Sequence, residues 1–374
     1  MNYTISNNQN ALERSFDDEA PHCAECFINT SAVGTLTNYK EVVDIDESYS
    51  FYDELKKYKY YGLSKLYLFQ TMEKLRKQKA FLNTNYLHDR INGTNIPLAD
   101  LVISAYHSPE RYYAEIQNRV NTLERIAKQR DLKPLFMTLT LPSEYHQYKT
   151  TKNNKLIKNK KYNGTTPNNA VKILTKMFSR LRQDRSLKEL SKENRIYFRV
   201  NEPHQDGTPH THILMFVPGD RIQRVKKAYE RLYDNRANDI QIITDDINNS
   251  VAYVMKYINK VLPLSKKKEL SEKELYLNAW YSKNRIIRFN SSKTLAPLSL
   301  YRLLHKQYSM FALTKLVNEK SLTVYVTIDT NKILEIFDGD EMIYSRNDSY
   351  DIKSIVNNLQ NYSQTNDSAI GSAA

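Results

Sequence analysis

Two stretches near the middle of the chain carry apolar residues in the pattern of paired β-strands. Residues 195–201 (RIYFRVN) and 212–217 (HILMFV) flank Asp206-Gly207, a dipeptide typical of a tight hairpin turn. Apolar residues alternate with threonine over residues 135–141, and a short apolar stretch follows at 240–243. These four segments predict a central antiparallel sheet.

Helical spacing of apolar residues surrounds these predicted strands in the sequence. Residues 108–130 open with Ser-Pro-Glu, which is typical of a helix start, and then repeat an aliphatic residue every three to four positions. The same spacing predicts helices over 170–190, 221–233 and 247–262, and one or two helices over 50–82. The fold class is therefore predicted as α+β, with helices against one face of the central antiparallel sheet.

Composition and periodicity divide the chain into six segments. They are a flexible acidic arm (1–45), a helical N-terminal region (46–130), a core (131–265), a helical extension (266–320), a small β meander (321–360) and a disordered tail (361–374). Within the meander, turns are predicted at Thr330-Asn331 and Asp338-Gly339. The core contains all four predicted strands of the central sheet.

The net charge of +13 is distributed unevenly along the chain. Residues 1–50 carry a net charge of −7, so the other 324 residues carry +20. A body this basic favours a polyanionic partner, either nucleic acid or an anionic membrane surface. The Lys- and Asn-rich stretch 149–169 has no periodicity and is predicted to be a mobile basic loop. Its candidate DNA-binding residues are Lys152, Lys155, Lys158, Lys160 and Lys161.

Two other features of the sequence bear on the location of the protein and on zinc binding. No apolar run approaches the roughly 20 residues of a membrane span, and no signal-peptide pattern is visible, so a cytoplasmic protein without a membrane partner is expected. The two cysteines, Cys23 and Cys26, lack a second pair to complete four zinc ligands. They are interpreted as reduced thiols.

The stretch NEPHQDGTPHTH, residues 201–212, gathers three of the eight histidines of the chain. Residues two apart on a strand point to the same face, so His210 and His212 are predicted to lie side by side. With Glu202 as a third ligand, they are predicted to bind Mg²⁺ or Mn²⁺ and leave positions open for a substrate phosphate. A surface hairpin with incidental histidines is the alternative.

The third ligand depends on the turn. If Asp206-Gly207 forms a two-residue turn, Asn201 lies opposite His212 and Glu202 faces away from both histidines. A bulge near Pro203 would rotate Glu202 inward. His204 and Asp206 are competing third ligands.

Two tyrosine pairs with helical spacing are candidates for a nucleophile. In Tyr253/Tyr257 each tyrosine is followed three residues later by a lysine, Lys256 or Lys260, and all four side chains are expected near one helical face. The ammonium groups, together with a metal ion and a bound phosphate, would help a phenol of pKa about 10 to attack phosphorus. Tyr229/Tyr233 lacks these lysines and is interpreted as packing or a DNA-facing surface.

These residues carry a family resemblance. EPHQDGTPHTH resembles the His-hydrophobic-His (HUH) motif of rolling-circle replication initiators, most closely that of phage gene A-type replication endonucleases. It is similar also to initiators of circular single-stranded DNA viruses, in which the Glu and both His residues bind the metal. Three more stretches resemble family motifs in the family's order: FMTLTLPSEYH (136–146), AYVMKYINK (252–260) and NAWYSKNRIIRFN (278–290). The resemblance covers about residues 95–310.

The resemblance implies an HUH endonuclease core at 131–265 and a metal-dependent nickase of single-stranded origin DNA. A tyrosine would form a 5′-phosphotyrosine link and leave a 3′-OH, and the second tyrosine would serve strand transfer. Expected partners are origin DNA and the host helicase and polymerase, in a bacterial cell that carries a phage or prophage. The order of histidines before tyrosines is unlike that of conjugative relaxases. A two-tyrosine transposase and a non-catalytic origin-binding protein remain alternatives, and the oligomeric state stays open.

Overall fold

The computed structural model describes residues 3–4, 58–150, 156–233, 238–243, 247–262, 270–327, 330–346 and 349–354. Nearly all of the predicted acidic arm, the pair Cys23/Cys26 and the predicted tail lie outside these residues, as do Lys152 and Lys155. The chain forms two compact units: residues 33–71 with 113–319, and residues 1–32 with 72–112 and 320–374. No helix of the described residues is both long enough and apolar enough to cross a membrane.

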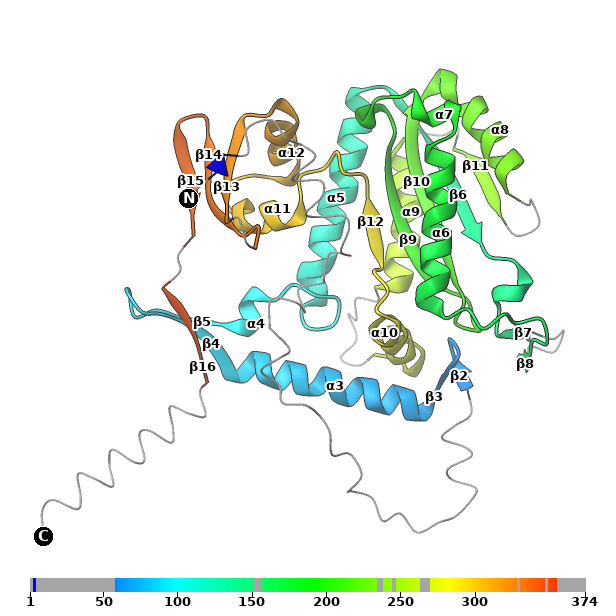
Figure 1. Ribbon diagram of the computed structural model, residues 1–374, viewed down its shortest axis with the longest axis horizontal. Coiled ribbons are helices and arrows are strands. Elements are labelled where there is room, and N and C mark those ends of the chain that lie inside the picture. Colours follow the sequence, from blue (N-terminus) through cyan, green and yellow to red (C-terminus); the bar gives the residue numbers. More distant parts are fainter. Residues whose placement is uncertain are drawn as a thin grey trace, which may run out of the picture. The chain divides into compact units, whose positions relative to one another are not determined.

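A five-stranded antiparallel sheet lies at the centre of the larger unit (Figure 1). Its order is β11-β6-β10-β9-β12, with β6 at Leu132–Thr140, β9 at Ile196–Pro203, β10 at Pro209–Pro218, β11 at Asp239–Ile242 and β12 at Phe289–Ser291. The four predicted strands are confirmed, each within a few residues of its expected bounds. The histidine strand β10 is the middle strand, and its apolar run is nearly continuous because helices cover both faces of the sheet.

One face of this sheet is covered by α6 (Pro167–Arg182), α7 (Arg185–Lys188) and α8 (Ile222–Leu232), as Figure 1 shows. Alternate residues of β6 and β10 pack against the apolar stripes of these helices: Leu135, Met137, Leu139, Ile213, Met215, Val217, Leu174, Phe178, Leu181, Leu187 and Val225. The helix predicted over 170–190 is interrupted, because Asp184 caps a new helix by accepting a hydrogen bond from the Ser186 backbone nitrogen at 2.9 Å.

The opposite face of the sheet carries α9 (Ile247–Val261), so the expectation of helices against one face is wrong. Val254 and Ile258 of this helix are fully buried, and Phe136 of β6 contacts the rings of Tyr253 and Tyr257. The strand period of two places Phe136 on the face away from Leu135 and Met137. The sheet is therefore sandwiched between helices, which is still an α+β arrangement.

The larger unit also contains elements at its margins. They are β2 (Tyr58–Tyr60), β3 (Leu63–Ser64), β7 (Tyr148–Thr150), β8 (Leu156–Lys158), most of α5 (Pro109–Gln129), α10 (Glu272–Asn284), α11 (Leu298–Leu304) and α12 (Met310–Glu319). Two predictions are corrected here. The region 50–82 contributes a β2–β3 hairpin before helix α3 (Lys65–Thr84) begins, because Tyr61 and Gly62 adopt positive φ and form a turn. The predicted basic loop is partly paired, as β7 with β8.

The smaller unit holds two sheets. One has the order β1-β13-β14-β15, with β1 at Tyr3–Thr4, β13 at Leu322–Val326, β14 at Ile333–Asp338 and β15 at Glu341–Ser345. The other joins β4 (Asn85–Asp89), β5 (Asn95–Pro97) and β16 (Tyr350–Ser354), beside the short α4 (Leu98–Leu101). Within the predicted segment 321–360, β13, β14 and β15 form a meander with Asn331 and Gly339 at positive φ in its turns, whereas β16 pairs with β4 in the other sheet.

Candidate active site

The turn between β9 and β10 decides which side chains face the histidines. The His204 backbone nitrogen donates to the Thr208 carbonyl at 2.8 Å, and the Gly207 nitrogen donates to the His204 carbonyl at 2.9 Å. The loop therefore has three residues, Gln205 to Gly207, and Gly207 takes the left-handed conformation with φ of +87°. The two-residue turn considered from the sequence is wrong.

This three-residue loop shifts the pairing of the strands by one position. Glu202 lies directly opposite His210, and Val200 lies opposite His212. Side chains of directly paired residues share a face, so Glu202 joins both histidines without any bulge at Pro203.

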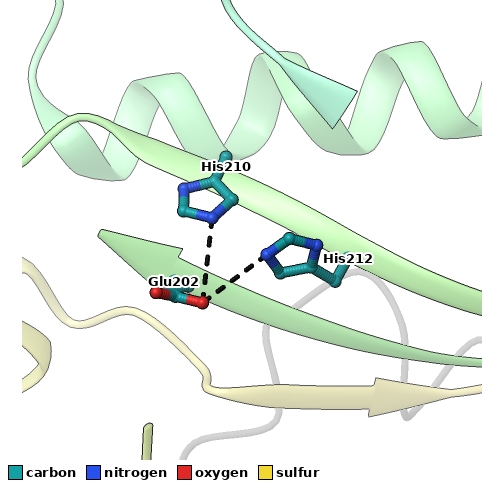
Figure 2. Close-up of side chains that lie close together, drawn as sticks. All are labelled: Glu202, His210 and His212. Atoms are coloured by element: carbon teal, nitrogen blue, oxygen red, sulfur yellow. Dashed lines mark ion pairs between the residues drawn. The ribbon is translucent and has the colours of Figure 1, made fainter. Parts of the chain in front are cut away.

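The three side chains converge on one point (Figure 2). Oε2 of Glu202 lies 3.7 Å from Nε2 of His210 and 3.5 Å from Nε2 of His212. All three residues are at most 8% exposed. Oε2 of Glu202 and Nε2 of His212 are buried and have no hydrogen-bond partner. Buried lone pairs that face each other are unfavourable unless a proton or a cation lies between them, so the cluster fits a metal ion.

The competing ligands do not join this cluster. Among the described residues, Glu202, His210 and His212 form the group of potential ligands whose donor atoms all lie within 4.8 Å of one another. The Asp206 carboxylate accepts hydrogen bonds from His146 and Thr208. The His204 ring packs beside His210 at a tilt of 35°, with centroids 4.1 Å apart. A set of one carboxylate and two imidazoles suits Mn²⁺ well. For Mg²⁺, only the carboxylate is a preferred type of ligand.

The protonation states of the cluster suit a cation. Burial raises the pKa of Glu202, but the neighbouring His212 ring and the Lys260 ammonium outweigh this effect, and the net pKa is lowered. Burial, with the neighbouring His204 and His212, holds the pKa of His210 well below its usual value. Glu202 is thus ionised and His210 neutral near pH 7, which are the states that bind metal.

The ring of His212 is oriented by a neighbouring strand. Its Nδ1 lies 3.0 Å from Oγ1 of Thr138 on β6, the residue directly paired with it. With Nδ1 protonated and donating to Thr138, the lone pair of Nε2 points at the cluster.

Helix α9 brings both predicted tyrosines to the same place. The Tyr257 ring lies 3.9 Å from the His212 ring, centroid to centroid, and the Tyr253 and Tyr257 hydroxyls are 3.4 Å apart. Burial, followed by the hydrogen bond with Tyr253, raises the pKa of the Tyr257 phenol. Its ionisation therefore needs positive charge nearby.

The two predicted lysines differ in position. Nζ of Lys260 forms an ion pair with Oε1 of Glu202, the oxygen that does not face the histidines. Nζ of Lys256 lies over the Tyr253 ring, 5.4 Å from its centroid. Lys260 thus lies beside Glu202, and Lys256 lies beside Tyr253.

The other tyrosine pair is part of the core. Tyr229 and Tyr233 are buried on the opposite face of the sheet, where the Tyr229 hydroxyl donates to the Thr138 carbonyl at 2.6 Å and that of Tyr233 donates to the Met177 carbonyl. Of the two roles considered for them, packing is confirmed. Of the predicted DNA-binding lysines, Lys158, Lys160 and Lys161 are exposed.

His146 had no role predicted from the sequence, although it ends the stretch FMTLTLPSEYH (136–146). Its Nδ1 is 3.0 Å from Oδ2 of Asp206, and its Nε2 is 3.2 Å from the Leu141 carbonyl. Both neighbours are acceptors, so both nitrogens must carry protons. Burial alone would lower the pKa of His146, but the Asp206 carboxylate outweighs it and raises the pKa. Only the fold reveals this ion pair, because its partners lie 60 residues apart.

A second missed feature is the contact between two turns. A Cβ on Gly62 would lie 2.6 Å from the Asp206 carbonyl oxygen, and a Cβ on Gly207 would overlap the Tyr61 carbonyl oxygen. Trp280 of α10 donates from Nε1 to the Gly207 carbonyl at 3.0 Å. The β2–β3 turn and α10 thus hold the histidine loop in place.

The sequence of the chain matches a family of known proteins. Residues 54–263 match the family described as bacteriophage replication gene A protein (GPA). The chain is 31% identical over 202 residues to the replication gene A protein of Escherichia phage 186, covering 50% of this chain and 28% of that protein. It is 30% identical over 197 residues to the probable replication protein P12 of Pseudoalteromonas phage PM2, covering 50% and 29%.

A third relative carries a name that states an activity. The probable replication endonuclease from prophage-like region 1 of Salmonella typhi is 28% identical over 241 residues, covering 58% of this chain and 28% of that protein. The chain therefore covers less than a third of the length of these three relatives. No solved structure matches it.

Proposed function

The chain belongs to the bacteriophage replication gene A protein family, and we propose that it is a replication initiator that nicks single-stranded origin DNA by metal-assisted tyrosine attack. The observation that carries the proposal is the convergence of Glu202, His210 and His212 with the Tyr257 ring 3.9 Å from His212. A nucleophile and a cation site at one point are what phosphodiester transfer requires. The name of the Salmonella typhi relative supports the endonuclease activity.

The protein side chains have distinct roles in this reaction. Glu202, His210 and His212 hold Mn²⁺ or Mg²⁺, which when bound supplies Lewis-acid polarisation of the scissile phosphate. Tyr257 or Tyr253 attacks phosphorus through its hydroxyl oxygen. The bond from phosphorus to the 3′-oxygen breaks, and the phenol proton ends on that oxygen. The products are a 5′-phosphotyrosine and a free 3′-OH. Lys256 places a positive charge near the Tyr253 ring, and Lys260 pairs with Glu202 at the cluster, where its charge can stabilise the negative charge that builds up on the phosphate.

The pair of tyrosines suits a second transfer. Their hydroxyls are 3.4 Å apart, so both reach the same phosphate position from one helix. While one tyrosine holds the 5′ end, the other cleaves the regenerated origin, and the released 3′-OH attacks the first link to close a circle. A host polymerase would extend the 3′-OH, with a host helicase opening the duplex, in the cytoplasm of the bacterial host. A transposase would use the same chemistry, but the replication names of the relatives favour an initiator.

The test is the replacement of Tyr253 and Tyr257 by phenylalanine, which removes the nucleophilic oxygens and keeps the rings that pack on Phe136. We expect the double variant to fold and bind DNA but to form no covalent adduct. Each single variant should keep partial cleavage of an oligonucleotide and fail to recircularise a replicated strand.

Tyr229→Phe is the matched control, because it removes a phenol from the other side of the same sheet and should leave adduct formation intact. Mass spectrometry of the trapped adduct identifies the tyrosine. Nucleotide on Tyr229 or Tyr233 would overturn the site assignment. A wild-type protein that binds DNA and forms no adduct would be a binding factor instead.

A further inference from the structure

A cavity of about 690 Å³ opens beside the candidate metal site. It is lined by Thr140, Leu141, Ser143, His146, Tyr148, Lys149, His204, Gln205 and Asp206. Its volume lies within the range of about 300–1,000 Å³ that is usual for ligand pockets. The mechanism proposed above assigns it no role.

The cavity adjoins the metal site through His204. This ring packs on His210 at 4.1 Å between centroids and on His146 at 5.3 Å. Nε2 of His204 is buried and has no hydrogen-bond partner. A ligand in the cavity therefore lies one imidazole ring away from the site of the scissile phosphate.

The lining matches the chemistry of a nucleotide. The His146–Asp206 ion pair leaves little net charge, so Lys149 gives the cavity a positive balance that suits a phosphodiester. The Ser143 and Thr140 hydroxyls and the Gln205 amide supply donors and acceptors for a base edge. The Tyr148 ring supplies an aromatic surface on which a base can stack.

The position of the cavity selects one side of the scissile bond. Along β10, Tyr257 contacts His212, whereas the cavity begins at His204 beside His210. The tyrosines and the cavity thus flank the cluster from opposite sides. In phosphoryl transfer the attacking and leaving oxygens are roughly in line with phosphorus. The leaving 3′-oxygen therefore points toward the cavity.

We propose that this cavity is a nucleotide-binding subsite that holds the nucleotide whose 3′-oxygen leaves, and that Gln205 and Ser143 contact its base. The proposal rests on the proposed nicking function. In this proposal the last nucleotide of the released 3′-OH strand contacts His146, Tyr148 and Lys149 as well as the loop of the β9–β10 hairpin.

The experiment fills the cavity and then removes the base that should occupy it. Ser143→Trp places an indole at the exposed rim of the cavity, and Ser191→Trp adds the same side chain at an exposed serine elsewhere in the larger unit. The substrate is a single-stranded oligonucleotide spanning the mapped nick. A second oligonucleotide carries an abasic residue at the nucleotide whose 3′-oxygen leaves.

We expect Ser143→Trp to lower kcat/KM at least tenfold on the intact oligonucleotide, and Ser191→Trp to leave it unchanged. On the abasic oligonucleotide, wild type and Ser143→Trp should be equal within twofold, because the base that clashes is gone. A tenfold loss that persists on the abasic strand, or no loss on either strand, would overturn the subsite. So would equalisation only when the abasic residue is on the 5′-phosphate side of the nick.

A second measurement does not depend on cleavage. In the Tyr253→Phe, Tyr257→Phe double variant, 5-iodouracil is placed at successive positions of the oligonucleotide and crosslinked by light. We expect the nucleotide whose 3′-oxygen leaves to crosslink to the peptide 141–149. Gln205→Ala should weaken the preference for one base at that position. Absence of wild-type adduct would refute the nicking function, whereas absence of this crosslink in a protein that nicks would refute only the subsite.

Discussion

Replacing Gly207 by alanine tests whether contact between the β2–β3 turn and the β9–β10 loop maintains the register of the β9–β10 hairpin. Gly207 has φ of +87°, and its missing Cβ leaves room for the Tyr61 carbonyl oxygen. The added Cβ is fixed directly to the backbone of one turn, and the oxygen it meets belongs to the backbone of the other turn, so no side-chain rotation can relieve the clash. Either the loop or the β2–β3 turn must move.

The cost can be worked out from its parts. The left-handed conformation costs a residue with a Cβ about 1–2 kcal/mol. Displacement of the loop also breaks the Trp280 to Gly207 hydrogen bond, worth about 0.5–1.5 kcal/mol. The two contributions together predict a destabilisation of about 1.5–3.5 kcal/mol, and displacement of the backbone adds to it. Gly164→Ala is the matched control, because Gly164 has φ of +83° and no atom within 4 Å of its missing Cβ, so only the first contribution applies.

The chain offers a local probe for this measurement. Trp280 is its single tryptophan, it is fully buried, and its Nε1 is bonded to Gly207 itself. Urea unfolding followed by tryptophan fluorescence should show a lower midpoint for Gly207→Ala than for Gly164→Ala. Mn²⁺ binding should weaken in Gly207→Ala alone, because a shifted loop moves Glu202 away from His210. Equal destabilisation of the two variants, with unchanged Mn²⁺ affinity in both, would refute the reasoning.

Three further outcomes are expected. Thr138→Val removes the partner of Nδ1 of His212 and should weaken Mn²⁺ binding about 10–100-fold by electron paramagnetic resonance, with wild-type affinity as the refuting result. In the smaller unit, hydrogen bonds from Ser349, and then from Ile91 and Asn92, lower the pKa of Asp89. Wild type should therefore exceed Asp89→Asn in stability above about pH 4, the unfolded pKa, and lose this advantage as pH falls below it; a difference independent of pH would contradict this. Alanine at Lys158, Lys160 and Lys161 should weaken binding of all single strands alike and flatten the salt dependence by about 0.7 for each phosphate that is no longer neutralised, whereas weaker binding of one sequence only would indicate base reading.

Much of the fold follows from local patterns in the sequence. Alternation with period two predicts β6 and β9, and period 3.6 predicts α5, α6, α8 and α9, because each pattern reflects burial of one side of a regular element. A continuous apolar run after the turn predicts β10. The same strand period is sufficient to place His210 and His212 on one face. These predictions need only the geometry of single elements.

The identity of the carboxylate that joins His210 and His212 depended on tertiary structure. Residues 201–212 are compatible with a two-residue or a three-residue loop, and a shift of one position turns Glu202 toward or away from the histidines. The observed loop is held by Tyr61, 146 residues before Gly207, and by Trp280, 73 residues after it. Neither contact leaves a local signal in the sequence.

The choice between the tyrosine pairs was likewise decided by packing. Tyr229/Tyr233 and Tyr253/Tyr257 have the same helical spacing, so each pair presents two phenols on one face of a helix. Helix α8 lies on the face of the sheet with Leu135 and Met137, and α9 lies on the face with His210 and His212. The sequence determined that the two phenols of each pair share one helical face, and the side of the sheet on which each helix packs determined which pair lies beside Glu202, His210 and His212.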